Sequence, residues 1–271
     1  MKNKTSFLLW IIGFLLLNLY FNGIPKLIQL DVLPWLAYAG GFFLLAFVVA
    51  RYLLGLKGLN SFGLPMQKGW GRDLGIGFIV GAFIWGLKYL AYYSLGKFEV
   101  TGLMDNGFIV GMLSQALLGM LLVSAINDIM IRGYWFACLK KTNLLKWFML
   151  GTTVLYVADD FWNEGFDWQN MVFSAILGFA LAYTVLKTDV IWMAIGIHFG
   201  SNMLFRIMSG FDGQGIFKLG NVSDGTLFEY VGLAVTALLL PVVYLVLRNR
   251  KATAPAPDQT IATDLSQSKL V

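Results

Sequence analysis

The strongest constraint in this sequence is a series of apolar runs, each long enough to cross a membrane as a helix. Crossing the hydrocarbon core takes about 20 helical residues. The runs lie near residues 6–24, 33–54, 74–96, 106–139, 146–163, 170–186, 190–208 and 226–247. Only 13% of the residues are charged, against roughly 25% in a soluble domain. The pattern predicts an all-α, polytopic integral membrane protein with about eight transmembrane helices, embedded in the lipid bilayer.

The domain organisation follows from where this pattern stops. Residues 1–250 contain every apolar run without a shift in composition, so we expect one transmembrane helical domain. The segment 251–271 is rich in Pro, Ser, Thr and Gln, which is typical of disorder, and we predict a disordered cytoplasmic tail. The single cysteine, Cys138, excludes an intramolecular disulfide and a cysteine-based zinc site. A net charge of +5 without a basic patch gives no indication of nucleic-acid binding.

The orientation is predicted by the distribution of Lys and Arg, which favour cytoplasmic loops. One set of alternate loops and ends holds most of them: Lys2, Lys4, Arg51, Lys57, Lys68, Arg72, Lys140, Lys141, Lys146, Lys187, Arg248, Arg250 and Lys251. The opposite loops hold only Lys26, Lys97 and Lys218, with Arg206 near the end of the seventh run. We therefore predict that both termini are cytoplasmic, and we expect a prokaryotic plasma membrane.

Function is expected from polar residues inside the apolar runs, because such residues are costly in hydrocarbon and usually line a cavity or pathway. Three clusters share this property: Asn127, Asp128 and Arg132 in the fourth run, Asp159 and Asp160 in the fifth, and His198 and Asn202 in the seventh. At about 1.5 Å per helical residue, they lie roughly 14–20 Å from the nearest cytoplasmic marker. Because the hydrocarbon core is about 30 Å thick, the three clusters are expected to meet in one polar pocket.

Each cluster also has a structural interpretation. Asp128 and Arg132 are four residues apart and can neutralise each other on one helix face. The aspartates of the fifth run can begin the acidic loop that follows it. His198 and Asn202 can serve as hydrogen-bonding groups between helices. Lys88, in the third run, has no motif around it and is expected to extend toward the membrane surface.

The order and spacing of these residues resemble the CPBP family of intramembrane proteases, which includes the CAAX prenyl endopeptidases and the bacteriocin-immunity (Abi) proteins. The family's first motif is Glu-Glu-x-x-x-Arg, and Asn127-Asp128-x-x-x-Arg132 matches this frame with both glutamates replaced. Its third motif, His-x-x-x-Asn, is intact as His198-x-x-x-Asn202. The first motif is therefore degenerate and the third is kept.

The second motif of the family, Phe-x-x-x-His, has two candidate counterparts here. These are Leu155-x-x-x-Asp159 and Tyr156-x-x-x-Asp160, and neither contains a histidine. The sequence does not decide between the two aspartates. Together, the three motifs extend the resemblance over about residues 105–205.

The resemblance implies a reaction in which the first glutamate and two histidines position and activate a water molecule. A general base must accept a proton from that water, which the amide of Asn127 cannot do near neutral pH. Zinc, sometimes proposed for the family, binds His, Cys or carboxylate ligands in near-tetrahedral sets. One histidine and two or three carboxylates form a poor set, so zinc is a weakly supported cofactor here.

Two hypotheses follow for the activity. In the first, the chain is an endopeptidase with an altered catalytic set, in which Asp128, Asp159 and His198 polarise water. In the second, it is a non-catalytic relative that acts in bacteriocin immunity or membrane-protein regulation. Both hypotheses predict a membrane-embedded or lipidated peptide as the substrate or partner.

Overall fold

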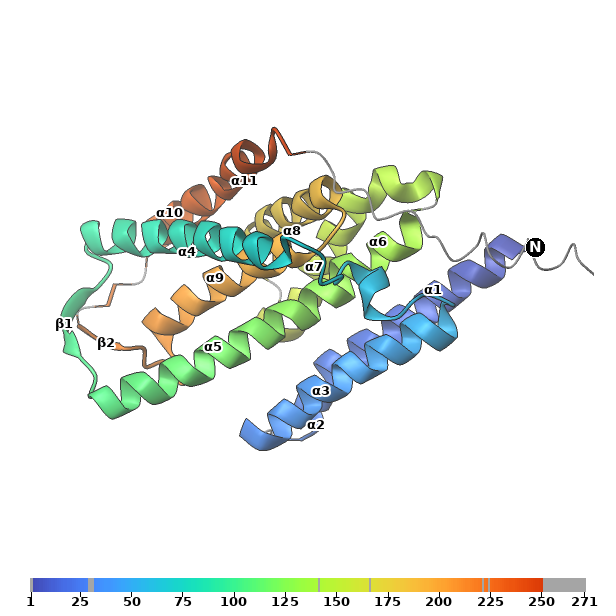
Figure 1. The fold of residues 1–271 in the computed structure, drawn as a ribbon. Helices are drawn as coiled ribbons and strands as arrows, with labels where there is room; N and C mark the ends of the chain where they lie inside the picture. The colour runs from blue at the N-terminus through green and yellow to red at the C-terminus, as the bar shows by residue number, and fades with distance from the viewer. Residues whose placement is uncertain are drawn as a thin grey trace, which may run out of the picture.

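The computed structural model describes residues 2–28, 32–140, 142–165, 167–220, 222–223 and 225–250. Helices dominate, and they run along each other as a bundle (Figure 1). This confirms the all-α, polytopic membrane class predicted from the apolar runs. The predicted tail, 251–271, lies outside the described residues.

The helices follow the apolar runs in chain order, and three of them continue through a π-helical turn. They are α1 (Lys2–Asn18) with η1 (Leu19–Gly23) and α2 (Ile24–Leu27), α3 (Val32–Val48) with η2 (Val49–Leu53), α4 (Trp70–Ser94), α5 (Asn106–Asp128) with η4 (Ile129–Gly133) and α6 (Tyr134–Leu139), α7 (Phe148–Glu164), α8 (Trp168–Thr188), α9 (Trp192–Ser209), and α10 (Thr226–Ala237) with α11 (Leu239–Leu247). Short 3-10 helices, η3 (Leu59–Phe62) and η5 (Asn143–Trp147), lie in the connections.

Six helical segments in the described part of the chain are long and apolar enough to cross a membrane. The other two expected spans form α7 and α9, which have 17 and 18 residues and carry the polar candidates of the fifth and seventh runs. The protein is thus an integral membrane protein. The count of eight spans stays a prediction.

The closest packing of two helices joins α4 and α9. Gly77 and Gly81 of α4 face Gly196 and Gly200 of α9, and a methyl group on any of the four would meet backbone atoms of the opposite helix. Small residues four apart let two membrane helices approach until their backbones are in contact. The spacing therefore fixes α9, which carries His198, against α4.

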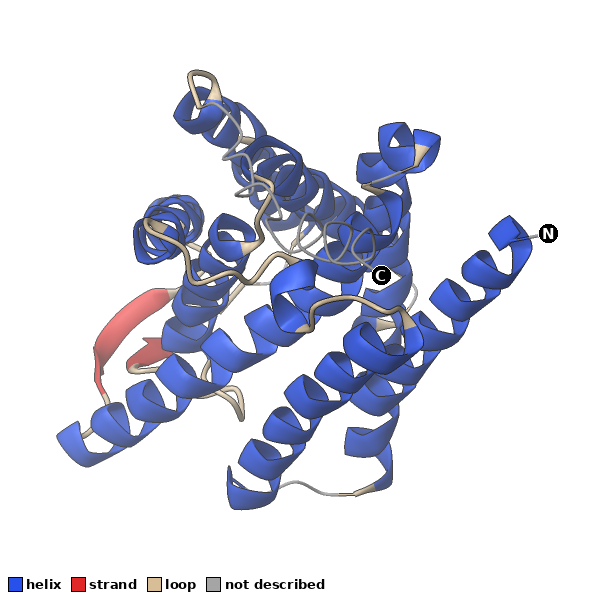
Figure 2. Ribbon diagram, turned by 45° about the vertical axis from the view of Figure 1, so that its right-hand side comes forward, coloured by secondary structure: helices blue, strands red, loops and turns tan. Residues whose placement is uncertain are grey.

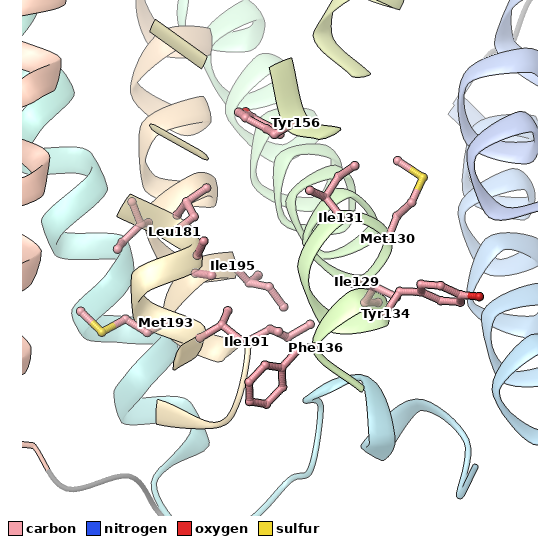
Figure 3. Packing of buried hydrophobic residues seen from close by; sticks show 14 of the residues in the cluster. Ile129, Met130, Ile131, Tyr134, Phe136, Tyr156, Leu181, Ile191, Met193 and Ile195 are labelled. Atoms are coloured by element: carbon pink, nitrogen blue, oxygen red, sulfur yellow. The ribbon is translucent and has the colours of Figure 1, made fainter. Parts of the chain in front are cut away.

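A second close approach joins the loop before α4 to the middle of the bundle. Gly133 of η4 packs against the carbonyl group of Phe62. The next carbonyl, of Gly63, accepts a hydrogen bond of 2.9 Å from the backbone N–H of Ile191, just before α9. Buried apolar side chains of η4, α6 and the start of α9 fill the surrounding space (Figure 3).

Strands are confined to one end of the bundle (Figure 2). β1 (Glu99–Leu103) and β2 (Phe217–Gly220) pair antiparallel, with an irregularity between Val100 and Gly102. They join the connection between α4 and α5 to the one between α9 and α10, so they fasten the ends of four helices together.

Candidate functional site

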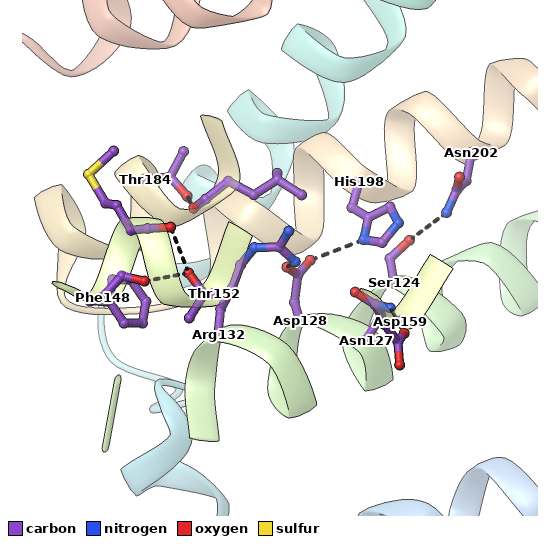
Figure 4. A network of polar contacts seen from close by, with 12 residues as sticks. Ser124, Asn127, Asp128, Arg132, Phe148, Thr152, Asp159, Thr184, His198 and Asn202 are labelled. Atoms are coloured by element: carbon purple, nitrogen blue, oxygen red, sulfur yellow. Dashed lines mark hydrogen bonds and ion pairs between the residues drawn. The ribbon is translucent and has the colours of Figure 1, made fainter. Parts of the chain in front are cut away.

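A buried polar network lies where α5, η4, α7 and α9 meet (Figure 4). The side chains of the three predicted clusters enter it from separate helices. Asn127, Asp128, Arg132, Asp159 and His198 are all buried. Residues up to 71 positions apart in the sequence thus contribute to one interior region.

Asp128 occupies the centre of this network. Its Oδ1 accepts a hydrogen bond of 2.6 Å from Nη1 of Arg132, and its Oδ2 lies 3.4 Å from Nδ1 of His198. The guanidinium of Arg132 lies 4.6 Å from the ring centre of Tyr156, whose ring meets that of His198 edge-on at 6.0 Å. A buried carboxylate therefore stands between a cation that balances its charge and an imidazole that it can orient.

Asp159 is held by three side-chain amides. Nδ2 of Asn18 and Nδ2 of Asn22 each lie 2.7 Å from Oδ1, and Nδ2 of Asn127 lies 3.3 Å from Oδ2. Amide donors stabilise an ionised carboxylate, but they also occupy the oxygens that would accept a proton. Asp159 is consequently a better anchor for other residues than a general base.

Two of these amides come from the N-terminal helix and were not predicted as site residues. Asn18 is the last residue of α1 and Asn22 lies in the π-helical turn η1. Both are polar residues inside an apolar run, so the rule that selected the other clusters also applies to them. Arg132 also lies in such a turn, η4, and π-helical turns within α-helices are frequent at functional sites.

The two aspartates of α7 point to different partners. Asp160 accepts a short hydrogen bond from the hydroxyl of Ser174 on α8. Asp159 instead contacts Asn127, in the counterpart of the first motif. Asp159 therefore joins the first-motif cluster, whereas Asp160 is linked to α8.

Asn202 links α9 to α5 beside the network. Its Nδ2 donates a hydrogen bond of 3.3 Å to Oγ of Ser124, which is buried one turn before Asp128. His198 lies one turn before Asn202 on the same face of α9 (Figure 4). The third-motif pair and the first-motif cluster thus lie along the same helix contact.

A groove of about 350 Å³ lies between α3 and α5. Its walls are mostly apolar and include Trp35, Leu36, Leu118 and Val123, with Arg206 of α9 among the lining residues. A second hollow of about 320 Å³ shares Gln115 and Phe211 with the first, so the two adjoin along α5.

The inner end of this groove lies close to the polar network. Val123 directly precedes Ser124, and Arg206 follows Asn202 by four residues, one helical turn. A molecule in the groove would therefore lie next to the contact between α5 and α9. An apolar groove beside buried polar groups suits a ligand with an apolar segment and a peptide bond.

The side chains of the network do not fit a zinc ion. In the described part of the chain, no group of three His, Cys, Asp or Glu side chains has the arrangement to hold a metal. His198 and Asp128 face each other, whereas the oxygens of Asp159 are engaged by amides. A zinc site needs at least three protein ligands directed at one point.

The fold and the network define an integral membrane protein with a polar site inside its helical bundle. Residues 109–204 match the family model described as type II CAAX prenyl endopeptidase, Rce1-like. This segment is therefore similar to that family, and the match confirms the resemblance to the CPBP proteases. Comparisons with curated proteins and with solved structures give no match. The matched segment contains Asn127, Asp128, Asp159, His198 and Asn202, whereas Asn18, Asn22 and the α3 wall of the groove lie outside it.

Proposed function

We propose that this chain is an intramembrane endopeptidase of the CAAX-protease-like type, with an altered catalytic set centred on His198 and Asp128. The observation that carries the proposal is the 3.4 Å approach of His198 Nδ1 to Asp128 Oδ2. Both atoms are buried, and neither has a hydrogen-bond partner among the described residues. A carboxylate directed at one imidazole nitrogen holds the ring so that the other nitrogen can accept a proton.

In the proposed reaction, His198 acts as the general base. Its Nε2 takes a proton from water while the water oxygen bonds to the peptide carbonyl carbon. The same proton then passes to the leaving amine as the C–N bond breaks. Arg132 balances the charge of Asp128, and the amide of Asn202 donates a hydrogen bond to the developing oxyanion.

The substrate in this proposal is a membrane-embedded or lipidated peptide bound in the groove between α3 and α5. The apolar walls receive its apolar or lipid-modified part. The neighbouring contact of α5 with α9 then places a peptide bond beside His198.

A second candidate function is peptide binding without cleavage, and the hydrogen bonds of Asp159 favour it. Its oxygens are engaged by Asn18, Asn22 and Asn127, and Asn127 itself cannot act as a base. Such a protein would use the same groove to hold a peptide in bacteriocin immunity or membrane-protein regulation.

Cleavage of an internally quenched, prenylated peptide by the full chain in liposomes separates the two functions. If His198 is the base, His198→Ala should lower the rate by about 10²-fold or more, while Asn127→Ala should retain most of it. Ser114→Ala, on the exposed side of α5, is the control. A native chain that binds the peptide without cleaving it, and gains cleavage with Asn127→Glu, Asp128→Glu and Asp159→His together, would support the second function instead.

The groove can be tested under either function. Gly119 lines it, and a Cβ at this position meets no atom within 4 Å, so Gly119→Trp should fold while filling the groove. Gly86→Trp, on the open side of α4, adds the same side chain elsewhere. Unchanged binding of the peptide by Gly119→Trp would exclude the groove as its path.

We also propose that both termini are cytoplasmic in a prokaryotic plasma membrane, which the Lys and Arg distribution supports. In a Cys138→Ser background, cysteines at Asn60 and Asn143 should react with an impermeant reagent only from the cytoplasmic side. A cysteine at Gly165 should react only from the other side. Labelling of all three from one side would refute the orientation.

A further inference from the structure

A further pocket, which shares no lining residue with the two hollows along α5, lies between α4, α8 and α10. Its volume is about 170 Å³. The polar and aromatic side chains that line it are Lys88, Tyr92, Gln169, Asn170, Phe173 and Glu229. The pocket is formed where α4 ends and where α8 and α10 begin, so it lies near one boundary of the membrane-spanning bundle.

Lys88 supplies a positive charge to this pocket from within a membrane-spanning helix. Its Nζ lies 4.5 Å from the ring centre of Trp85, 5.4 Å from that of Tyr89 and 5.6 Å from that of Phe173. Among the residues that the structure describes, no carboxylate forms an ion pair with it. The rings hold the ammonium in place but do not neutralise it. An ionisable group at this depth indicates a functional partner.

The opposite side of the pocket presents hydrogen-bond acceptors. Nε2 of Gln169 donates a hydrogen bond of 2.8 Å to Oε2 of Glu229. That contact directs the amide, and Oε1 of Gln169 is left buried with no hydrogen-bond partner in the described structure. A carboxylate and a free amide oxygen together suit a cationic N–H donor.

We infer that this pocket binds a phospholipid headgroup that carries both a phosphate and a primary ammonium group. The phosphate pairs with Lys88, and the ammonium donates to Glu229 and to Gln169 Oε1. Gln169 and Glu229 lie in the first turns of α8 and α10, and Lys88 is six residues, about 9 Å, before the end of α4. The side chains of all three residues line one pocket at this end of the bundle, where lipid headgroups meet membrane helices.

The predicted contacts distinguish an ethanolamine headgroup from choline and glycerol headgroups. A trimethylammonium group has the same charge but no N–H to donate, so phosphatidylcholine should lose the contacts to Glu229 and Gln169. Phosphatidylglycerol keeps the phosphate and lacks the cation. One charge-assisted hydrogen bond corresponds to about a tenfold or larger difference in binding.

Lipid retention by the full chain tests the inference. The purified protein is exchanged with dioleoyl phosphatidylethanolamine, phosphatidylcholine or phosphatidylglycerol, and bound lipid is measured by native mass spectrometry and by the thermal unfolding midpoint. The ethanolamine lipid should be retained about tenfold over the choline lipid. Equal retention of all three lipids would overturn the inference. If soluble glycerophosphoethanolamine shifts the midpoint and the lipid does not, the ligand is a soluble zwitterion. That result would also overturn the inference.

Variants of Lys88 and Glu229 test the phosphate contact and the ammonium contact separately. Lys88→Met should abolish retention of both the ethanolamine and the glycerol lipid, whereas Glu229→Gln should remove the preference for ethanolamine over choline and keep phosphate binding. Glu229 is exposed, so its variant should fold. Lys146→Met is the matched control, because Lys146 also lies over a tryptophan, at 5.9 Å from the ring centre of Trp147. Native lipid preference in both pocket variants would refute the site.

Discussion

Two helices bring side chains to the polar network from opposite sides, and they are held in opposite ways. α9 is fixed to α4 by glycines that bring the two backbones into contact, and it carries His198. α1 lies in a hairpin with α3 at the side of the bundle (Figure 1) and is attached to α7 through hydrogen bonds from Asn18 and Asn22 to Asp159. Shape therefore positions the histidine, whereas two of the contacts that hold the N-terminal helix end on one carboxylate.

The two helices should therefore respond to different changes in the protein. Contact between backbones does not depend on the protonation of any side chain, so α9 should keep its place whether or not the network is charged. The attachment of α1 instead includes a carboxylate, that of Asp159, which accepts hydrogen bonds from the amides of Asn18 and Asn22. We expect the α4–α9 contact to tolerate no added volume and the α1–α7 contact to tolerate no loss of charge.

The largest effect is expected from Gly200→Ala. The added methyl group would meet backbone atoms of Phe78 and Ala82, which cannot move without shifting α4. Overpacking of a rigid contact typically costs about 1–3 kcal/mol and sometimes more, and we expect about 3 kcal/mol of lost unfolding free energy. Equilibrium unfolding in mixed micelles measures it.

Gly86→Ala is the matched control, because it adds the same methyl group to α4 where a Cβ meets nothing within 4 Å. Its unfolding free energy should stay the same or rise by less than about 1 kcal/mol, because alanine favours the helix. Equal effects of the two substitutions would show that the α4–α9 contact is not the close approach described here.

A smaller effect is expected from Asn22→Ala at the other helix. It removes one donor from the Asp159 carboxylate, and a hydrogen bond to a charged group contributes about 1.5–3 kcal/mol in folded proteins. Because hydrogen bonds between membrane helices contribute less, we expect about 1.5 kcal/mol. Asn143→Ala, at an exposed position, should have little effect on the unfolding free energy.

Exchanging the donor and the acceptor sharpens this test. Asp159→Asn alone should lose the charge that the amides of α1 bind, whereas Asp159→Asn with Asn22→Asp restores a carboxylate–amide pair at the same place. Recovery of more than half of the lost stability is expected from the double variant. No recovery would show that α1 is held by its apolar contacts and not by Asp159.

The apolar runs were sufficient to predict the helical elements, because the length and composition of a span follow directly from bilayer thickness. The continuous helical segments Val32–Leu53, Asn106–Leu139 and Thr226–Leu247 agree with the predicted runs within a few residues at both ends. The strands β1 and β2 were not predicted, because their five and four residues lie in polar connections without a long alternating pattern.

The network could be predicted only in part. The fixed rise per helical residue was enough to predict that Asp128, Asp159 and His198 lie at a similar depth in the membrane. Which atoms meet depends on helix rotation, and that is set by tertiary packing such as the glycine contact of α9. The roles of Asn18 and Asn22 were missed for the same reason, although their polarity inside an apolar run was visible.

The smallest effect is expected from Tyr134→Phe, which tests a further contact of α1. The hydroxyl of Tyr134, on α6, is 2.6 Å from the carbonyl oxygen of Trp10 and donates to it. Removing the hydroxyl leaves the ring in place, so only one neutral hydrogen bond is lost, and the average value between membrane helices is about 0.6 kcal/mol. Tyr230→Phe, at a position 56% exposed, should leave the unfolding free energy unchanged. If Tyr134→Phe instead destabilises the protein as much as Asn22→Ala does, the neutral contact would hold α1 as firmly as the carboxylate does. The contrast between a helix fixed by shape and one held by charge would then fail for α1.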